Sequence, residues 1–333
     1  MKLEIGNFYV RDIVFGDRLS YQDGVLTIQK EEALEFIKQD DRITEAELYI
    51  VKPGDKVRLC PVKEAIEPRV RPDGRSAFPG YTGDLAPAGS GVTHALKNCS
   101  VLVVGRHWGG FQDGLIDMSG EGQKYTLFGQ FNNLVLVADT NEEFEKREQQ
   151  KKNDALRRAG HRLAEYVAGC VKELVPEETE VFELGGMIKR DAETEKLPSV
   201  VYVMQPQSQM EEMGYNDLVY GWDMNHVVPT VMHPNEILDG AMVSGSFMPV
   251  SSKWSTYDFQ NCPNIKALYR EHGKTINFLG VIMSNLNVAL EQKERSAQFV
   301  AQIANSLGGD GAVVAEEGYG NPDADFVACI VAL

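Results

Sequence analysis

Short apolar runs separated by Gly, Asp and Pro fill the first 140 residues of the chain. Examples are "LEIGNFYV", "GVLTIQ", "AELYIVK" and "KVRLCPV", all rich in β-branched and aromatic residues, a composition typical of strands. The one clear helical pattern among them is "EEALEFIKQ". Residues 1–140 are therefore predicted to form a mainly β domain. It includes a Pro/Gly-rich loop at residues 67–91, which is too irregular for regular secondary structure.

The pattern becomes helical after residue 140. Thr140 and Glu143 fit a capping box. Apolar residues then recur at three- or four-residue steps as far as Pro176, which predicts a long amphipathic helix. Nearer the end of the chain, a second helix is expected to stop with Gly308 in the C′ position, where glycine is favoured.

Strand-like runs alternate with helical patterns in the C-terminal half. "SVVYVMQ", "NFLGVIMS" and "GAVVAEEG" each predict a buried strand. A final helix is expected to begin with Asn321 as N-cap and Pro322 at its first position. The alternation predicts a doubly wound parallel-sheet α/β domain over residues 141–333. Because the chain stops within its last predicted helix, this domain is expected to be a C-terminally truncated version of a longer one.

Composition narrows the classes of function. The formal net charge is −16, so the surface field repels phosphate backbones and nucleic acid is not expected as a partner. No apolar run approaches the roughly 20 residues of a membrane span, and the N-terminus lacks the apolar core of a signal peptide, which favours the cytoplasm. The five cysteines are scattered without a CxxC pair, so neither a disulfide framework nor a zinc site is indicated.

Ligands of open α/β sheets bind at the carboxyl ends of the strands. "MQPQSQ", "SNLN" and "EEGYGNPDAD" occupy such places. The last contains Glu316, Glu317, Asp323 and Asp325, which suit an ammonium or a metal better than a phosphate. A helix with acidic residues in its first turn explains them equally well.

Motifs for other cofactors are missing from the sequence. His226 and His233 would lie on opposite faces of an extended segment, so they are not expected to share a metal ion. The sequence has no GxGxxG after a strand, no P-loop and no GxSxG elbow. We therefore predict no metal and no nucleotide cofactor.

Several collinear segments carry a resemblance to one family. Among them are "LEIGNFYVRDIVFG", "PGDKVRLCPVKEAIEPRV", "VVPTVMHPNEILDGAMVSG", "STYDFQNCPNIKALYREHGKTINFLGVIMSNLNV" and "GGDGAVVAEEGYGNPDAD". Over essentially its full length the chain resembles the α/β proprotein subunit of component B of glycine, sarcosine and betaine reductases. D-proline reductase has a related proprotein.

The resemblance implies a chemistry as well as a fold. Precursors of this family are cut at a cysteine that becomes an N-terminal pyruvoyl group, and a selenocysteine-containing subunit completes component B. The pyruvoyl carbonyl would form a Schiff base with the amine substrate, and the selenolate would then attack the α-carbon and expel the amine. A small amine or amino acid substrate, a selenoprotein partner and an oligomeric assembly are therefore expected.

The segment after "DGAMVSG" departs from that pattern. It reads "SFMPVSSKWSTY" and contains no cysteine. Ser251 or Ser252 could form the same pyruvoyl group through an ester that eliminates to dehydroalanine, with Lys253 nearby as an assistant. Two alternatives stay open: an uncleaved, non-catalytic paralogue that acts as a scaffold or binding subunit, and a D-proline-reductase-like subunit.

Five residues in family-like segments are candidates to hold a substrate ammonium at the predicted strand ends. They are Asp239, Asn285, Glu317, Asn321 and Asp323.

Overall fold

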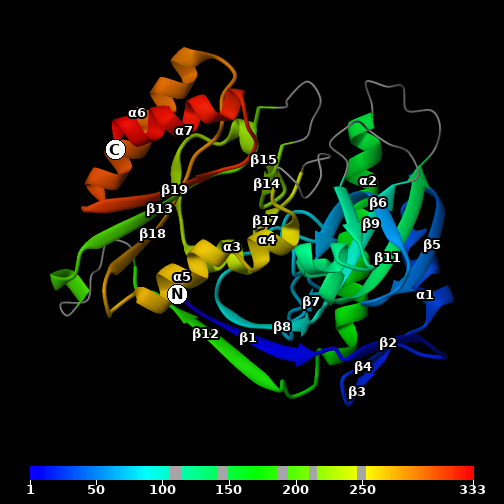
Figure 1. Cartoon of the computed structure of the whole chain (residues 1–333). Helices are drawn as coiled ribbons and strands as arrows, with labels where there is room; N and C mark the ends of the chain where they lie inside the picture. The colour runs from blue at the N-terminus through cyan, green and yellow to red at the C-terminus, as the bar shows by residue number, and fades with distance from the viewer. Residues whose placement is uncertain (106–113, 141–148, 187–193, 210–215, 246–252) are drawn as a thin grey trace.

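A five-stranded sheet forms the centre of the N-terminal half (Figure 1). The computed structural model describes residues 1–105, 114–140, 149–186, 194–209, 216–245 and 253–333, and of 149–153 only the backbone. β11 runs parallel to β9, and the other neighbours are antiparallel. In sheet order the strands are β10 (Gly114–Asp117), β6 (Arg58–Ile66), β9 (Cys99–Gly105), β11 (Asn132–Thr140) and β5 (Ile43–Val51).

The long helix α2 (Gln149–Ala168) covers one face of this sheet. Its apolar stripe, which includes Leu156, Ala159 and Leu163, is fully buried against Val103 and Leu136 of the strands. This confirms the amphipathic helix predicted from the spacing of its apolar residues. The predicted capping box at Thr140 and Glu143 involves residues outside the described part of the chain. Two further elements lie beside α2. One is α1 (Lys30–Ile37), and the other is a small sheet of β2 (Asp12–Phe15), β4 (Val25–Ile28) and β3 (Ser20–Gln22).

A second sheet joins the two halves of the chain along the lower edge of Figure 1. In this sheet β1 runs antiparallel to β12 on one side and parallel to β8 on the other. Because β12 follows α2 in sequence, strands from both sides of residue 140 share this sheet, and the division into domains at that residue stays a prediction. The strands are β12 (Glu178–Glu183), β1 (Lys2–Tyr9), β8 (Gly91–Lys97) and β7 (Arg69–Val70).

The C-terminal sheet is mixed, with three parallel strands and one antiparallel edge strand. Two of the predicted strands, "SVVYVMQ" and "NFLGVIM", are its two central, buried members. The described chain is thus of mixed α and β structure built from several sheets. In order the strands are β16 (Thr230–Met232), β18 (Asn277–Met283), β13 (Ser199–Gln205) and β19 (Gly311–Glu316).

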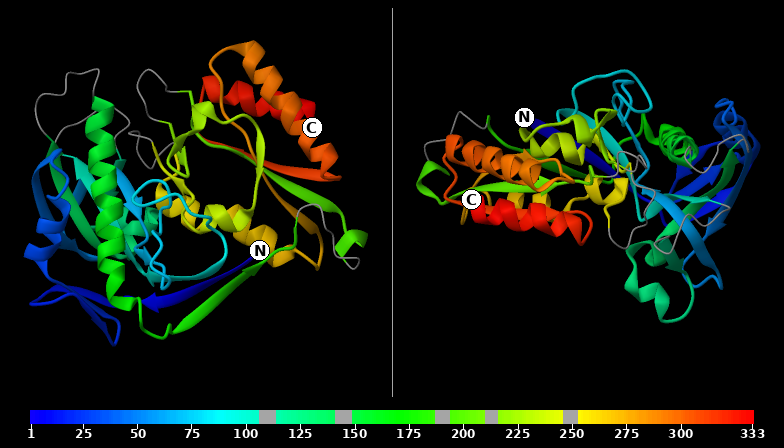
Figure 2. Two further views of the ribbon diagram at one scale, coloured as in Figure 1. Left: turned by 180° about the vertical axis from the view of Figure 1, so that it is seen from behind. Right: turned by 90° about the horizontal axis from the view of Figure 1, so that it is seen from above.

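Helices cover both faces of this sheet (Figure 2). α6 (Leu290–Ser306) and α7 (Asn321–Ala332) pack side by side on the face that carries Val201 and Val203. Tyr202 and Met204 point to the opposite face, where α3 (Pro234–Leu238), α4 (Thr256–Gln260) and α5 (Pro263–Glu271) contribute to the core. A short sheet of β15 (Trp222–Asp223), β14 (Leu218–Val219) and β17 (Met242–Val243) lies between this region and the N-terminal half.

Three sequence predictions need correction. "GAVVAEEG" does form a strand, but β19 is an edge strand and its residues are exposed or half-buried, because nothing described covers its outer side. Asn321 is the first helical residue of α7 rather than its N-cap, which is Gly320. The Pro/Gly-rich segment contains a short strand, β7, that pairs with β8. By contrast, Gly308 follows α6 with a φ of +66°, as expected for a C′ glycine.

The described residues contain neither a membrane-spanning helix nor a cluster of metal-ligating side chains. No helix there is long and apolar enough to cross a membrane, and no group of three or more His, Cys, Asp or Glu side chains is placed to hold a metal ion. Short 3₁₀ turns complete the described chain: Gly122–Tyr125, Leu127–Gln130, Gly169–Val171, Thr194–Lys196 and Met224–His226.

Candidate functional site

Two buried carboxylates meet where β13 and β19 end. The amide of Glu317 donates to the carbonyl of Gln205, which extends the parallel pairing of the two strands by one residue. Glu317 and Asp217 are each at most 1% exposed. The single amide of Gln207 donates to both, at 3.0 Å to Asp217 Oδ2 and 2.9 Å to Glu317 Oε2. One backbone N–H therefore holds the two side chains as a pair.

The surroundings of this carboxylate pair, Asp217 and Glu317, disfavour the ionised form of Glu317. Burial raises the pKa of Glu317 well above its ordinary value, and the neighbouring charge of Asp217 and a hydrogen bond to it raise this pKa further. Two carboxylates in contact in a desolvated place cannot both ionise readily. The protonated form of Glu317 is therefore more favoured here than it is for an exposed glutamate.

The chain on both sides of residues 246–252 is fastened to this carboxylate pair. The amide of Gly245 donates to Asp217 Oδ1 at 2.9 Å, and the amide of Trp254 donates to Glu317 Oε1. Arg157 on α2 donates to the carbonyl of Gly245. The segment singled out in the sequence thus begins and ends beside the pair, although Ser251 and Ser252 themselves lie outside the described residues.

Lys253 is the remaining charged group at this place. Its side chain is buried, and its Nζ has no hydrogen-bond partner in the described part of the chain. Burial lowers the pKa of Lys253, while the charges of Glu317 and Asp217 oppose that shift. Lys253 and the carboxylate pair therefore lie close together in a desolvated environment.

A second buried network supports the site from the N-terminal half. Glu64 on β6 accepts from the amide of Thr256 at 3.0 Å, and Thr256 Oγ1 lies 3.0 Å from both Glu64 Oε2 and His161 Nε2. Burial raises the pKa of Glu64 to about 8 and lowers that of His161 to about 3, so both are neutral at pH 7. Because Thr256 Oγ1 also accepts from the amide of Ser244, this network fixes the strand that leads into Gly245.

Asp239 lies in a buried ion pair away from the carboxylate pair. Its carboxylate forms an ion pair with buried Arg71 at 2.9 Å and accepts from the amide of Gly89 and the hydroxyl of Thr93, both at 2.7 Å. None of these contacts reaches Glu317 or the other predicted site residues. Asp239 therefore fastens the Pro/Gly-rich segment to the end of α3.

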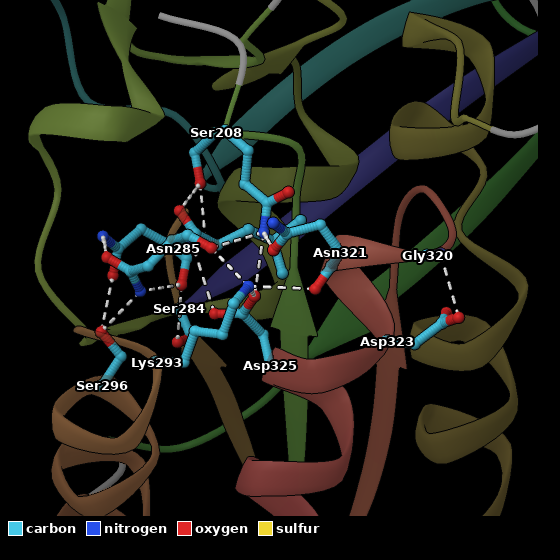
Figure 3. A network of polar contacts seen from close by, with 12 residues as sticks. Ser208, Ser284, Asn285, Lys293, Ser296, Gly320, Asn321, Asp323 and Asp325 are labelled. Carbon is cyan, nitrogen blue, oxygen red and sulfur yellow. Dashed lines mark hydrogen bonds and ion pairs between the residues drawn. The ribbon is translucent and has the colours of Figure 1, made fainter. Parts of the chain in front are cut away.

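Asn285 and Asn321 belong to another polar network, which surrounds the buried ion pair of Lys293 and Asp325 (Figure 3). Asn285 accepts from Ser296 Oγ at 3.2 Å, and the carbonyl of Asn321 accepts from Lys293 Nζ at 3.0 Å. The network connects the loop after β18 to α6 and α7, and its polar atoms are already bonded to one another.

Asp323 accepts from the amide of Gly320 at 3.0 Å and so caps α7, as the alternative interpretation of the acidic run proposed. Of the five predicted ammonium ligands, only Glu317 lies in the carboxylate pair.

Sequence reasoning missed the other members of the site. Asp217, Glu64 and the α2 residues Arg157 and His161 come from three separate segments and form no local motif. Asp217 lies in the connection between β13 and β14, just before β14, so it was not marked by a position directly after a strand as Glu317 was.

Comparison with known proteins places these features in a family context. The sequence model of the glycine/sarcosine/betaine reductase component B subunits matches residues 1–333. The chain is 71% identical to the betaine reductase complex component B subunit alpha of Peptoclostridium acidaminophilum, an alignment that covers all of this chain and 76% of the relative.

Two further relatives from that organism are less similar. The sarcosine reductase complex component B subunit alpha is 40% identical, and the glycine reductase complex component B subunits alpha and beta are 39% identical. In both cases the alignment covers 98% of this chain and 75% of the relative. No solved structure matches the chain.

Proposed function

Because this chain belongs to the glycine/sarcosine/betaine reductase component B family, we propose that it binds the substrate of a betaine-type reductase complex. The observation that carries the proposal is the contrast in identity: 71% to the betaine relative against 40% and 39% to the sarcosine and glycine relatives. The substrate is then a quaternary ammonium carboxylate. The bond broken is the one between its nitrogen and its α-carbon, and a selenocysteine-containing partner supplies the nucleophile.

The chemistry of a quaternary nitrogen accounts for the missing cysteine. Such a nitrogen has neither a lone pair nor a hydrogen, so it cannot form a Schiff base, and trimethylamine can leave without prior activation. The residues from Ser246 to Lys253 include no cysteine. The described residues Gly245 and Trp254 on either side of them donate to the carboxylate pair, and negative charge there would disfavour an oxyanion during self-cleavage. These features do not fit a pyruvoyl group, and we propose an uncut chain in which Ser251 and Ser252 are not processed.

The carboxylate pair supplies the charge that a quaternary ammonium needs. A cation next to Glu317 favours the ionised form of that side chain, so binding lowers its raised pKa. The trimethylammonium group donates no hydrogen bonds, so attraction by nearby negative charge is the main polar contribution available to it. The nucleophile would then approach the α-carbon from the side opposite the pair.

Titration calorimetry of the purified chain tests the proposed substrate. We expect glycine betaine to bind at least about tenfold more tightly than sarcosine or glycine, a difference of about 1.4 kcal/mol. Tighter binding of sarcosine or glycine would assign the chain to those substrates, and tighter binding of D-proline would favour the D-proline-reductase-like alternative. No binding of any of the four would favour the scaffold alternative.

Intact-protein mass spectrometry with and without a hydrazine tests the absence of a carbonyl group. We expect one uncut mass that the hydrazine does not change. The glycine reductase relative, treated in the same way, serves as the positive control. Two fragments divided near Ser251, with the C-terminal one carrying the hydrazone mass, would instead establish a serine-derived pyruvoyl group.

Glu317→Gln tests the ammonium-binding role. The variant keeps the shape of the side chain and removes its charge, so we expect betaine affinity to fall at least about tenfold. The pH dependence of choline binding is a second readout, because choline carries the quaternary ammonium without a carboxylate. Wild-type affinity should rise with pH as Glu317 loses its proton, and the variant should lose that rise. Unchanged affinity and an unchanged pH profile would remove Glu317 from the site.

A further inference from the structure

Lys253 is a buried cation without a counter-ion bonded to it. Its side chain is 6% exposed, and the ammonium group makes no hydrogen bond within the described residues. Leaving a buried charge unpaired is costly. Such a group is retained more readily where a ligand completes its contacts.

Three other buried cations among the described residues are paired with carboxylates, which sets them apart from Lys253. Lys293 contacts Asp325 and two backbone carbonyls, Arg69 contacts Glu67, and Arg71 contacts Asp239. Each of these pairs fastens two segments together. Lys253 has no such partner.

The surroundings of Lys253 are complementary to a zwitterion. The charges of Glu317 and Asp217 act on its ammonium group, but their oxygens already accept from the amides of Gln207, Gly245 and Trp254. No ion pair joins Lys253 to either carboxylate among the described residues. The place therefore offers the free donors of Lys253 and negative charge from an adjacent pair.

We propose that the ammonium of Lys253 binds the carboxylate of the substrate while the carboxylate pair faces its quaternary nitrogen. This inference rests on the proposed function, because it takes the ligand to be an ammonium carboxylate. One methylene separates the two charged groups of glycine betaine, so its ends would require a cation and an anion close together. Lys253 then fixes the orientation of the α-carbon that the nucleophile attacks.

A comparison of glycine betaine with choline distinguishes the contribution of Lys253 to binding from that of the carboxylate pair. Choline carries the quaternary ammonium with a hydroxyl in place of the carboxylate. In the wild-type chain, betaine should bind at least about tenfold more tightly than choline. In Lys253→Met, betaine affinity should fall at least about 30-fold and choline affinity should stay within about twofold, which also shows that the variant is folded. Lys266→Met is the matched control, because that half-buried lysine has a partner in Asn261, and its betaine affinity should be unchanged.

Each outcome decides between the two proposals. Equal affinity of the wild-type chain for betaine and choline, or full betaine affinity in Lys253→Met, would overturn the role of Lys253 and leave the proposed function in place. If the wild-type chain prefers sarcosine and Lys253→Met no longer binds it, betaine is the wrong substrate, but Lys253 does bind the carboxylate of the substrate. If it binds none of these ligands, both are overturned. The wild-type comparison requires no variant, so a folding failure of Lys253→Met leaves the test intact.

Discussion

Glu67→Ala should lower the free energy of unfolding by about 3–5 kcal/mol, the range for removing one partner of a buried ion pair. The side chain of Glu67 is buried and accepts from Arg69 at 2.7 Å and from Lys97 at 2.9 Å. Its backbone exchanges hydrogen bonds with Gln260 on α4. The variant would leave the buried guanidinium of Arg69 unpaired at the contact between the N-terminal half and α4.

The effect should depend on pH in a defined direction. Burial alone would raise the pKa of Glu67, but Lys97 and Arg69 outweigh it and lower the pKa from an ordinary 4.5 to about 2. A lowered pKa contributes stability that is fully present above pH 4.5 and is lost as the pH falls toward 2. The difference between wild type and variant should therefore be smaller at pH 3 than at pH 6.

Urea denaturation followed by circular dichroism at both pH values measures this difference. Glu4→Ala is the control, because Glu4 forms only an exposed ion pair with Lys2, and its free energy of unfolding should change by less than about 0.5 kcal/mol. A Glu67 variant as stable as the Glu4 variant at pH 6 would show that the Glu67 ion pairs contribute little.

Gly245→Ala should reduce betaine affinity at least about tenfold, because an added Cβ displaces backbone that is bonded to the carboxylate pair. A Cβ at this position would lie 1.3 Å from the carbonyl oxygen of Asn216 and 2.4 Å from its carbonyl carbon, so one of the two backbones must move. That movement breaks the contacts of Gly245 with Asp217 and Arg157, which hold the chain at the carboxylate pair.

The matched control for Gly245→Ala is Gly169→Ala. An added Cβ at Gly169 meets nothing within 4 Å, so its betaine affinity and thermal midpoint should equal those of the wild type. Calorimetric titration of both variants gives the comparison. Wild-type affinity in Gly245→Ala would mean that this backbone position does not shape the site.

Local signals in the sequence were enough to predict much of the secondary structure. β13 and β18 were recognisable because both are central strands buried on both faces, which produces continuous apolar runs. The same reasoning wrongly predicted burial of β19, because an apolar run does not reveal that its strand lies at a sheet edge. Edge position depends on the order of strands, which is a tertiary property.

The candidate site was predictable only in part. Glu317 was found because it directly follows a strand, and carboxyl ends of strands are where α/β sheets bind ligands. Asp217 comes from a separate segment, and its pairing with Glu317 depends on a shared amide of Gln207. Asp239 occurs in an equally acidic context in the sequence, but Arg71, far away in the chain, makes it a structural ion pair.

The amine released during turnover provides the most direct test of the proposed function. The purified chain would be combined with the remaining components of the betaine reductase complex of Peptoclostridium acidaminophilum and a dithiol reductant, and given glycine betaine or sarcosine. Gas chromatography would measure the free amine. We expect trimethylamine from glycine betaine and little or no methylamine from sarcosine. Methylamine from sarcosine, with glycine betaine left intact, would contradict a site built for a quaternary ammonium.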